Sequence, residues 1–188
     1  MRVRTVCLGA LATNCYVVET EAHLVVVDPA TNSAELRRLL GDRRPDLVLN
    51  THGHFDHTGG NWSLGAARIG IHREDLPVVR LFFPHHPPFD LLLEDGQEVV
   101  PGIRVMHTPG HSPGSVVFLV EGAILSGDLL FAGSIGRTDL PGGNDDDMDR
   151  SLARVVALPG DWLVYPGHGE PTTLARERST NPFLGGAG

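Results

Sequence analysis

The sequence predicts a mixed α/β fold with many short strands and few helices. Apolar runs rich in Val, Ile and Leu recur along the chain, and Gly, Pro, Asn or Asp separates each run from the next. This pattern is typical of short strands joined by turns. Helical spacing of apolar residues is confined to three segments. The length of 188 residues favours one domain, at roughly 150 residues per domain.

The β-branched runs predict nine strands. Turn-forming residues bound each run, as expected for the strands of a folded sheet. Glu121 and Gly122 alone separate two of the runs, and such a two-residue connection is typical of a β-hairpin. The predicted strands are residues 3–8, 15–19, 24–28, 46–50, 68–71, 103–108, 115–120, 123–126 and 162–165.

The clearest helix signal follows the third predicted strand. Thr31 or Ser33 can cap a helix N-terminus, and Gly41 supplies a stop after Leu40. We therefore expect a helix that begins at one of these two residues and ends at Leu40. Its apolar side consists of Ala34, Leu36, Leu39 and Leu40.

Two further helices are expected. One is short and covers residues 74–80, and the other covers residues 146–157, where Asp residues at the start suit the positive end of a helix dipole. Residues 82–96 contain three prolines and two adjacent histidines without a regular period, so we expect a long loop there.

The charge balance excludes several function classes. Fifteen cations against 23 anions give a net charge of −8, which disfavours nucleic acid and anionic membrane surfaces as partners. All fifteen cations are Arg, so mechanisms that need a lysine, such as Schiff-base or P-loop chemistry, are excluded. No apolar run reaches the roughly 18 residues of a membrane span.

The cysteines and the N-terminus suggest a cytoplasmic protein. Cys7 and Cys15 are the only cysteines, so the chain has no disulfide framework, and we expect both in the core. Arg2 and Arg4 precede an apolar stretch that resembles an export signal, but the stretch is short and continues directly into a strand pattern. We therefore expect no export.

The densest functional signal is the segment Thr51-His-Gly-His-Phe-Asp-His57, which follows a predicted strand. Imidazole is the commonest transition-metal ligand in proteins, and carboxylate is a good companion for zinc or iron. The segment therefore predicts a metal site. Its candidate ligands are His52, His54, Asp56 and His57.

Three more candidate ligands follow later strands. His111, Asp128 and His168 each lie next to a Gly just beyond the carboxyl end of a predicted strand, where open sheets collect their ligand sites. Seven ligands exceed the four of a tetrahedral zinc, but they suit two ions about 3.5 to 4 Å apart that share a carboxylate and a water. Thr51, His107 and Ser112 are candidates for supporting contacts to the ligands, although for His107 we favour a strand residue in the core.

A competing motif can be excluded on physical grounds. Gly110-His-Ser-Pro-Gly114 matches the G-x-S-x-G pattern of serine hydrolases. The residue after the serine must donate its backbone N–H to the oxyanion, but Pro113 has no N–H. A serine-hydrolase mechanism would also leave the cluster at residues 51–57 unexplained.

The order H-x-H-x-D-H, T-P-G-H-S-P-G, G-D and G-H resembles the metallo-β-lactamase superfamily over nearly the whole chain. The resemblance implies a four-layer αββα sandwich of two mixed sheets flanked by helices. Asp128 stands where the zinc β-lactamases of this fold have cysteine, which argues against antibiotic hydrolysis. The resemblance places His52, His54 and His111 on one metal ion and Asp56, His57 and His168 on a second, with Asp128 bridging both.

Within the superfamily, residues 127–139 and 180–183 resemble the short, single-domain branch of the glyoxalase II group. This implies hydrolysis of a hydroxyacylglutathione-type thioester by a single domain, residues 1–188, without a C-terminal helical glutathione-binding domain. Arg137 occupies the place of a basic substrate-binding residue, but Asp139 replaces the tyrosine expected two positions later.

We expect a hydroxide that bridges two Zn²⁺ ions to attack the thioester, with Asp56 orienting it and Asp128 holding both ions. Iron is an open alternative in one or both sites, because histidine and carboxylate suit both metals. The G-R-T-D signature at residues 136–139 also resembles the persulfide dioxygenases, which use a single iron. A metal-dependent nuclease of the same superfamily is disfavoured by the acidic charge. The expected partner is a small-molecule thioester, and the oligomeric state stays open.

Overall fold

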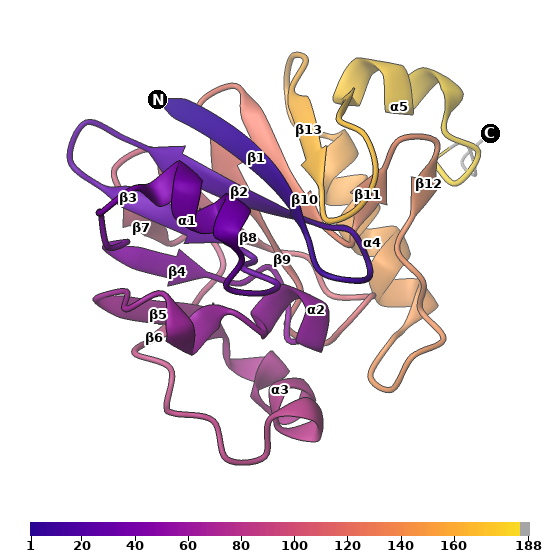
Figure 1. The fold of residues 1–188 in the computed structure, drawn as a ribbon. Helices are drawn as coiled ribbons and strands as arrows, with labels where there is room; N and C mark the ends of the chain where they lie inside the picture. The colour runs from indigo at the N-terminus through magenta and orange to yellow at the C-terminus, as the bar shows by residue number, and fades with distance from the viewer. Residues whose placement is uncertain (185–188) are drawn as a thin grey trace. The chain divides into compact units, whose positions relative to one another are not determined.

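The computed structural model describes residues 1–184 and confirms a mixed α/β fold with two mixed sheets. The chain divides into two compact units, Met1–Leu93 and the segment from Glu94 onward. Each unit contains one six-stranded sheet with its own helices (Figure 1). The prediction of one domain over residues 1–188 stays a prediction, and its last four residues lie outside the described part.

The first unit has the strand order β1-β2-β3-β4-β5-β6, which is also the order along the chain. The first three strands pair antiparallel, and β3 to β6 pair parallel. The carboxyl ends of the parallel strands therefore lie at one edge of the sheet, where ligand sites form. The strands are β1 (Arg2–Leu8), β2 (Thr13–Glu19), β3 (Leu24–Val27), β4 (Leu47–Leu49), β5 (Arg68–His72) and β6 (Leu91–Leu93).

Short helices connect these strands. The first, α1 (Ala34–Leu40), begins where Ser33 accepts a hydrogen bond from the Leu36 amide and ends at Gly41, as the sequence predicts. Helix α2 (Phe55–Thr58) directly follows the histidine-rich segment. The other elements are the 3₁₀ turns η1 (Asn61–Ser63) and η2 (Arg73–Asp75) and helix α3 (Leu76–Phe82).

The core of the first unit forms between the sheet and α1. Leu36 and Leu40 of the helix pack with Val17, Val26 and Val48 of three neighbouring strands, and all five are buried. Burying such side chains contributes about 1.5–3 kcal/mol each. This core supports the β3-β4 region, from which the metal-ligand candidates extend.

The second unit has the strand order β14-β13-β10-β9-β8-β7. Only β10 and β13 pair parallel, and the β9-β10 hairpin turns at Glu121 and Gly122 as predicted. The strands are β7 (Glu98–Val100), β8 (Ile103–His107), β9 (Val116–Val120), β10 (Ala123–Gly127), β13 (Leu163–Pro166) and β14 (Thr172–Thr173), with a separate ribbon of β11 (Leu130–Phe131) and β12 (Ser134–Ile135).

Two helices cover this sheet. In α4 (Asp145–Val156), Asn144 accepts a hydrogen bond from the Asp147 amide, and Met148, Leu152 and Val155 are buried against strand residues such as Ile124. Helix α5 (Leu174–Thr180) contributes the buried Leu174 to the same core.

All nine predicted strands and three predicted helices are present, but the sequence missed several elements. Strand β6 lies inside the predicted loop 82–96, because three nearby prolines masked a short strand. Helix α5 was not predicted, because only Leu174 and the carboxylate of Glu177 face its buried side. Cys7 is exposed rather than buried, since alternate residues of the edge strand β1 face solvent, whereas Cys15 is buried as expected.

None of the helices within residues 1–184 has the length and apolar character that crossing a membrane requires.

Candidate metal-binding clusters

The structure places the seven predicted ligands in two clusters, one in each unit. The first cluster occupies the connection from β4 to α2, and α2 carries its last two members. The second cluster is distributed over three connections that follow β8, β10 and β13. The first cluster is His52, His54, Asp56 and His57, and the second is His111, Asp128 and His168.

Close packing fixes the backbone of the first cluster. The Gly53 N–H donates a hydrogen bond to the buried carboxylate of Asp75, with a distance of 2.6 Å to Oδ2. A Cβ on Gly53 would lie 2.9 Å from the Asp75 carbonyl oxygen and 3.1 Å from a methyl group of Val79. Only glycine lets the loop approach the start of α3 this closely.

The side chains of the first cluster lie against one another. The ring centroid of His52 is 4.7 Å from that of His54 and 4.1 Å from that of His57. The Asp56 Oδ2 atom is 3.5 Å from His57 Nε2. His52 and His57 are buried, so the cluster brings nitrogen and oxygen donors together away from bulk water.

A carboxylate behind the cluster fixes the tautomers of two imidazoles. Asp28 Oδ2 lies 2.9 Å from His57 Nδ1, and it also accepts the hydroxyl proton of Thr51 at 2.6 Å. Since Thr51 Oγ1 has given its only proton to Asp28, the 3.1 Å contact with His52 Nδ1 requires that His52 donates. Both imidazoles therefore carry a proton on Nδ1, so Nε2 is the ring atom that would serve as the metal ligand.

Asp28 is a candidate functional residue that the sequence did not reveal. It is buried and adopts a left-handed backbone conformation, with φ of 52°, which is uncommon for residues other than glycine. Its Oδ1 atom also accepts the Thr51 amide at 2.8 Å. The only signal in the sequence was an aspartate before Pro29 at the end of a Val-rich strand.

The second cluster centres on Asp128. The Asp128 Oδ2 atom lies 3.6 Å from His111 Nε2 and 3.6 Å from His168 Nε2. Asp128 and His168 meet because they follow β10 and β13, the parallel neighbours whose carboxyl ends share one edge. The His111 Nδ1 atom lies 2.8 Å from the Arg137 carbonyl oxygen and donates to it, so His111 also presents Nε2.

Two glycines make the second cluster possible. A Cβ on Gly136 would lie 1.7 Å from the Asp128 carbonyl oxygen and 3.5 Å from His111 Cβ. Gly110, with φ of 141°, packs on the start of α4, where a Cβ would lie 2.5 Å from Met148 Cα. The Asn144 N–H donates to the Gly110 carbonyl at 2.8 Å, which ties the loop that carries His111 to the helix.

Both clusters fit a transition-metal ion. Two ligand atoms about 2.0–2.1 Å from a tetrahedral ion lie about 3.3 Å apart. The three nitrogen-to-oxygen separations of 3.5, 3.6 and 3.6 Å come close to this value. Metal-bound histidines usually donate the N–H of their other ring nitrogen to an oxygen atom, as these Nδ1 atoms do.

Arg137 lies beside the second cluster, and its guanidinium is paired. Its Nε and Nη2 atoms donate to Asp139 at 2.6 and 2.7 Å. The Arg137 hydrogen bond lowers the pKa of Asp139 to about 2. The two side chains line a cavity of about 460 Å³, which also contains Thr138, Asp145 and Asp149.

The three predicted supporting residues differ in their contacts. Thr51 contacts His52, as described above. The Ser112 hydroxyl pairs with the Ser115 hydroxyl at 2.7 Å. His107 ends β8 half-buried, and its Nε2 atom lies 2.9 Å from the Pro113 carbonyl oxygen.

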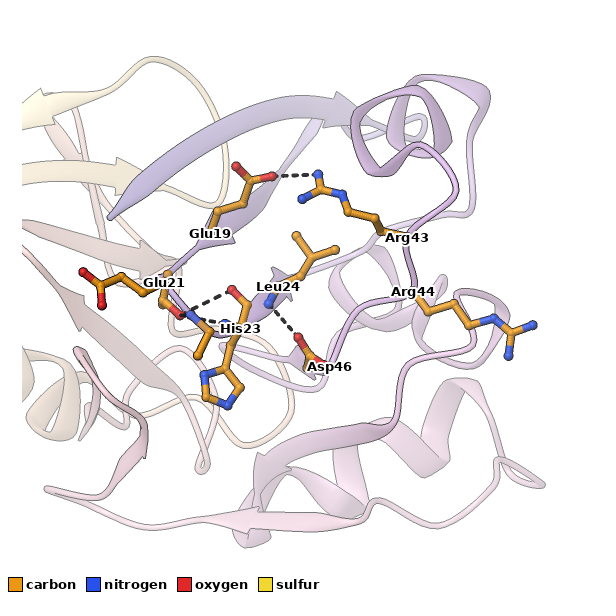
Figure 2. Close-up of a pocket in the computed structure, with 9 residues that line it drawn as sticks. Glu19, Glu21, His23, Leu24, Arg43, Arg44 and Asp46 are labelled. Carbon is orange, nitrogen blue, oxygen red and sulfur yellow. Dashed lines mark hydrogen bonds and ion pairs between the residues drawn. The ribbon is translucent and has the colours of Figure 1, made fainter.

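The first unit has a hollow of its own, which contains none of the predicted ligands (Figure 2). Its volume is about 480 Å³, and it lies around the turn between β2 and β3. Glu19 accepts a hydrogen bond from Arg43 at 2.7 Å, which lowers the Glu19 pKa, and Asp46 accepts one from the Leu24 amide at 2.7 Å. These contacts brace the turn and the start of β3.

Curated relatives resemble the chain over almost its full length. The probable metallo-hydrolase YqgX of Bacillus subtilis is 32% identical, and the match covers 99% of both chains. The hydroxyacylglutathione hydrolase GloC of Haemophilus influenzae is 28% identical, with 98% of both chains covered.

Solved structures share the fold. The crystal structure of TTHA1623 in a di-iron-bound form has a TM-score of 0.88 and 40% identity, covering 97% of this chain and 100% of that chain. BLEG-1 B3 metallo-beta-lactamase has a TM-score of 0.85 and 32% identity, covering 98% and 100%. ETHE1 from Myxococcus xanthus has a TM-score of 0.80 and 28% identity, covering 97% and 84%.

The family assignment agrees with the donor sets described above. Residues 8–168 match the sequence profile of the metallo-beta-lactamase superfamily. That range includes all seven predicted ligands and extends over both sheets. The chain therefore belongs to the metallo-β-lactamase superfamily.

Proposed function

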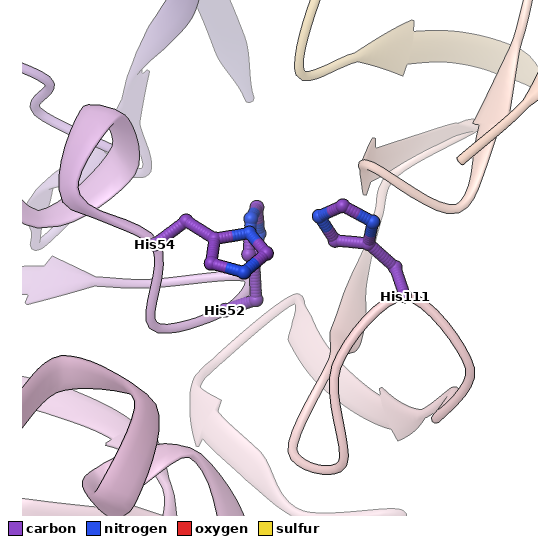
Figure 3. A group of neighbouring side chains, drawn as sticks. All are labelled: His52, His54 and His111. Carbon is purple, nitrogen blue, oxygen red and sulfur yellow. The ribbon is translucent and has the colours of Figure 1, made fainter. Parts of the chain in front are cut away.

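We propose that the two clusters together form one dinuclear zinc centre that hydrolyses a thioester of the hydroxyacylglutathione type. Asp56, His57 and His168 would hold one ion, and Asp128 would serve as a ligand to both. Figure 3 shows the three imidazoles that we assign to the other ion, with His52 and His54 on the loop before α2 and His111 on the loop after β8.

The observation that carries the proposal is that three imidazoles, those of His52, His57 and His111, carry a proton on the same ring atom, Nδ1. Each of them donates its Nδ1–H to an oxygen atom. His52 donates to the Thr51 hydroxyl, His57 to the Asp28 carboxylate and His111 to the Arg137 carbonyl. A histidine that serves only as a polar surface residue needs no such fixed tautomer. Here three of them present Nε2, which supports a metal-binding role for both clusters.

The bound ions supply an activated water at neutral pH and polarise the substrate carbonyl. Asp56 is placed to orient the attacking water and to accept its proton, because Thr13 Oγ1 donates to Asp56 Oδ2 at 3.0 Å and holds the carboxylate. In the hydrolysis, the carbonyl carbon gains a bond to the water oxygen and loses its bond to sulfur. The departing thiolate needs little protonation, since thiols have a pKa near 8.5.

No side chain is needed as the nucleophile. Ser112, the serine of the G-x-S-x-G pattern, pairs with Ser115, and Pro113 cannot donate to an oxyanion. The thioester assignment is supported by the likeness to GloC and by Arg137, which we propose contacts the polar thiol carrier. Zinc is our preferred metal, and the di-iron form of TTHA1623 makes iron the alternative to test.

The test measures metal content and thiol release together. Protein loaded with zinc or with iron is assayed on S-lactoylglutathione with a thiol reagent, alongside His54→Ala, Asp128→Ala and the control His23→Ala. His23 is a histidine of the first unit at the β2-β3 turn, outside the clusters. We expect both cluster variants to lose metal and turnover and the control to keep both. Turnover that persists in metal-free variants would refute the proposal.

A second candidate function is a persulfide dioxygenase with a single iron. The G-R-T-D signature at residues 136–139, which resembles the persulfide dioxygenases, favours it. Oxygen consumption with glutathione persulfide, by iron-loaded protein that leaves the thioester intact, would establish this alternative. A β-lactam serves as a control substrate because of the likeness to BLEG-1, and we expect it to stay intact.

A further inference from the structure

Two aromatic side chains of the first unit are exposed beside the loop at residues 51–57, which carries the first cluster and which we call the ligand loop. Phe55 is 46% exposed and Phe82 is 43% exposed. Their ring centroids are 5.3 Å apart, which is within the range of favourable aromatic pairs. Phe55 begins α2 and Phe82 ends α3, so two separate helices bring the rings together. We call these two side chains the aromatic pair.

The aromatic pair directly adjoins proposed metal ligands. The Phe82 ring packs edge-on against the His54 ring, with centroids 6.1 Å apart and an interplanar angle of 82°. Phe55 lies between His54 and Asp56 in the chain. A molecule bound at His54 through a metal ion would therefore have apolar surface within reach.

A hydrogen bond and close packing hold α3, which carries Phe82, against the ligand loop. The start of α3 is tied to the ligand loop by the hydrogen bond from Gly53 to the buried Asp75 carboxylate. Val79, one turn before Phe82, packs where a Cβ on Gly53 would come within 3.1 Å. A surface held in this way against the ligand loop can orient a bound molecule without first becoming ordered.

A small molecule is a better occupant than a protein. A stable protein interface uses about 20–30 residues on each side, whereas the aromatic pair and the exposed Leu81 of α3 make only three apolar residues. The cavity at Arg137 and Asp139 combines charged side chains with the apolar Ile135, Met148 and Phe183. The aromatic pair differs in that its apolar rings adjoin a proposed metal ligand, His54, so it suits the acyl group, whose carbonyl the metal ions would polarise.

We propose that Phe55 and Phe82 bind an apolar substituent on the acyl group of the substrate. This inference rests on the proposed thioester hydrolysis and narrows its substrate class. The preferred substrates carry an aromatic or longer aliphatic group where lactate carries a methyl group. Phe82 acts as a specificity-determining residue, because it faces a proposed metal ligand without being one.

The first test compares two thioesters of the same thiol. S-mandeloylglutathione differs from S-lactoylglutathione by a phenyl group in place of a methyl group. We expect wild-type kcat/KM, corrected for uncatalysed hydrolysis, to favour the mandeloyl substrate by about tenfold or more. Phe82→Ala should bring this ratio to within about twofold of unity, and Phe82→Leu should give an intermediate ratio.

Leu163→Ala is the matched control, because Leu163 is another exposed apolar residue, at 49%, outside both clusters. It should keep the wild-type ratio. A ratio near unity in the wild type, or one unchanged in Phe82→Ala, would overturn the inference. The inference would also be overturned if kcat/KM depended on an apolar thiol rather than on an apolar acyl group. Lactoyl thioesters of benzyl mercaptan and 2-mercaptoethanol measure this.

A second readout does not need turnover. Mandelate added to metal-free protein should shift the ring proton resonances of Phe55 and Phe82 and leave those of Phe183 unchanged. Shifts at Phe183 alone would overturn the inference. If wild-type protein loaded with zinc or iron hydrolyses neither thioester, the proposed function fails, and the resonance shifts still decide whether the aromatic pair binds an apolar acid.

Discussion

At the scale of single residues, the buried carboxylate of Asp28 orients side chains of the first cluster. It holds Thr51 and His57, and through Thr51 it sets the tautomer of His52. Its left-handed backbone is a conformation that Asn also tolerates. Asp28→Asn therefore changes the charge and the hydrogen-bond acceptors with little strain.

We predict that Asp28→Asn lowers zinc affinity by about 10–100-fold, since supporting contacts to metal ligands typically contribute this much. Competition with a chromogenic chelator measures the change. The control is Asp46→Asn, because Asp46 accepts the Leu24 amide at 2.7 Å and contacts no proposed ligand. Equal zinc affinities for the wild type and Asp28→Asn would show that Asp28 has no such role.

The exposed pair of Arg137 and Asp139 gives a pH prediction. The guanidinium holds the pKa of Asp139 down at about 2, below the ordinary 3.8. An acid with a lowered pKa stabilises the folded state above the unfolded pKa, and this contribution is lost as pH falls through the folded pKa. The pair should therefore stay intact at neutral pH and open between about pH 3.8 and 2.

Carboxyl chemical shifts measured by NMR across this pH range test the prediction. In the wild type, the Asp139 carboxyl should titrate near pH 2, and in Arg137→Ala its midpoint should return toward 3.8. A wild-type midpoint near 3.8 would mean that the pair does not form in solution.

At the scale of elements, backbone approach decides where the ligands lie. The connection after β12 passes so close to Asp128 that Gly136 has no room for a Cβ. Substituting Ala for Gly136 must displace the backbone either at Asp128 or at residue 136 itself. The effect should therefore combine lost stability with lost metal binding.

We predict that Gly136→Ala lowers the free energy of unfolding by at least about 1–3 kcal/mol, the usual cost of overpacking. The control is Gly96→Ala, where φ is +75° and no atom lies within 4 Å of a new Cβ, so the cost is backbone strain of about 1 kcal/mol. Urea denaturation compares the two. A smaller loss for Gly136→Ala than for Gly96→Ala would contradict this packing argument.

The elements also show what sequence patterns can predict. Runs such as Leu24–Val27 predicted their strands because a short β-branched run between turn-forming residues strongly favours extended structure. The ligand candidates could be named because His and Asp follow those strands. Asp28 could not be identified, since its partners lie at least 23 residues away and a single aspartate carries no pattern.

Buried polar contacts escaped the sequence analysis for the same reason. Glu177 on α5 is fully buried, and although burial alone would raise its pKa, hydrogen bonds from Thr172, Gly133 and Asn181 lower it. A helix with a carboxylate on its buried face lacks the regular apolar spacing that predicts a helix from sequence. Likewise, the approach of Gly53 to Asp75 appears only once the chain is folded.

At the scale of the whole molecule, metal binding should stabilise the fold. A ligand at about 1,000 times its dissociation constant adds about 4 kcal/mol to the free energy of unfolding. For a chain of 188 residues, each kcal/mol corresponds to roughly 2–4 °C in Tm. Chelation should therefore lower Tm by roughly 8–16 °C, as measured by calorimetry, and His23→Ala should respond like the wild type. An unchanged Tm after complete metal removal would contradict a centre formed from the folded clusters.

The most direct test of one dinuclear centre is the metal content per chain. Freshly purified protein, grown with zinc and iron both available, is measured by element-resolved mass spectrometry. We predict close to two metal ions per chain, mostly zinc, and close to none in Asp128→Ala. One iron per chain, or two ions that persist in Asp128→Ala, would contradict the shared centre and the proposed zinc hydrolase.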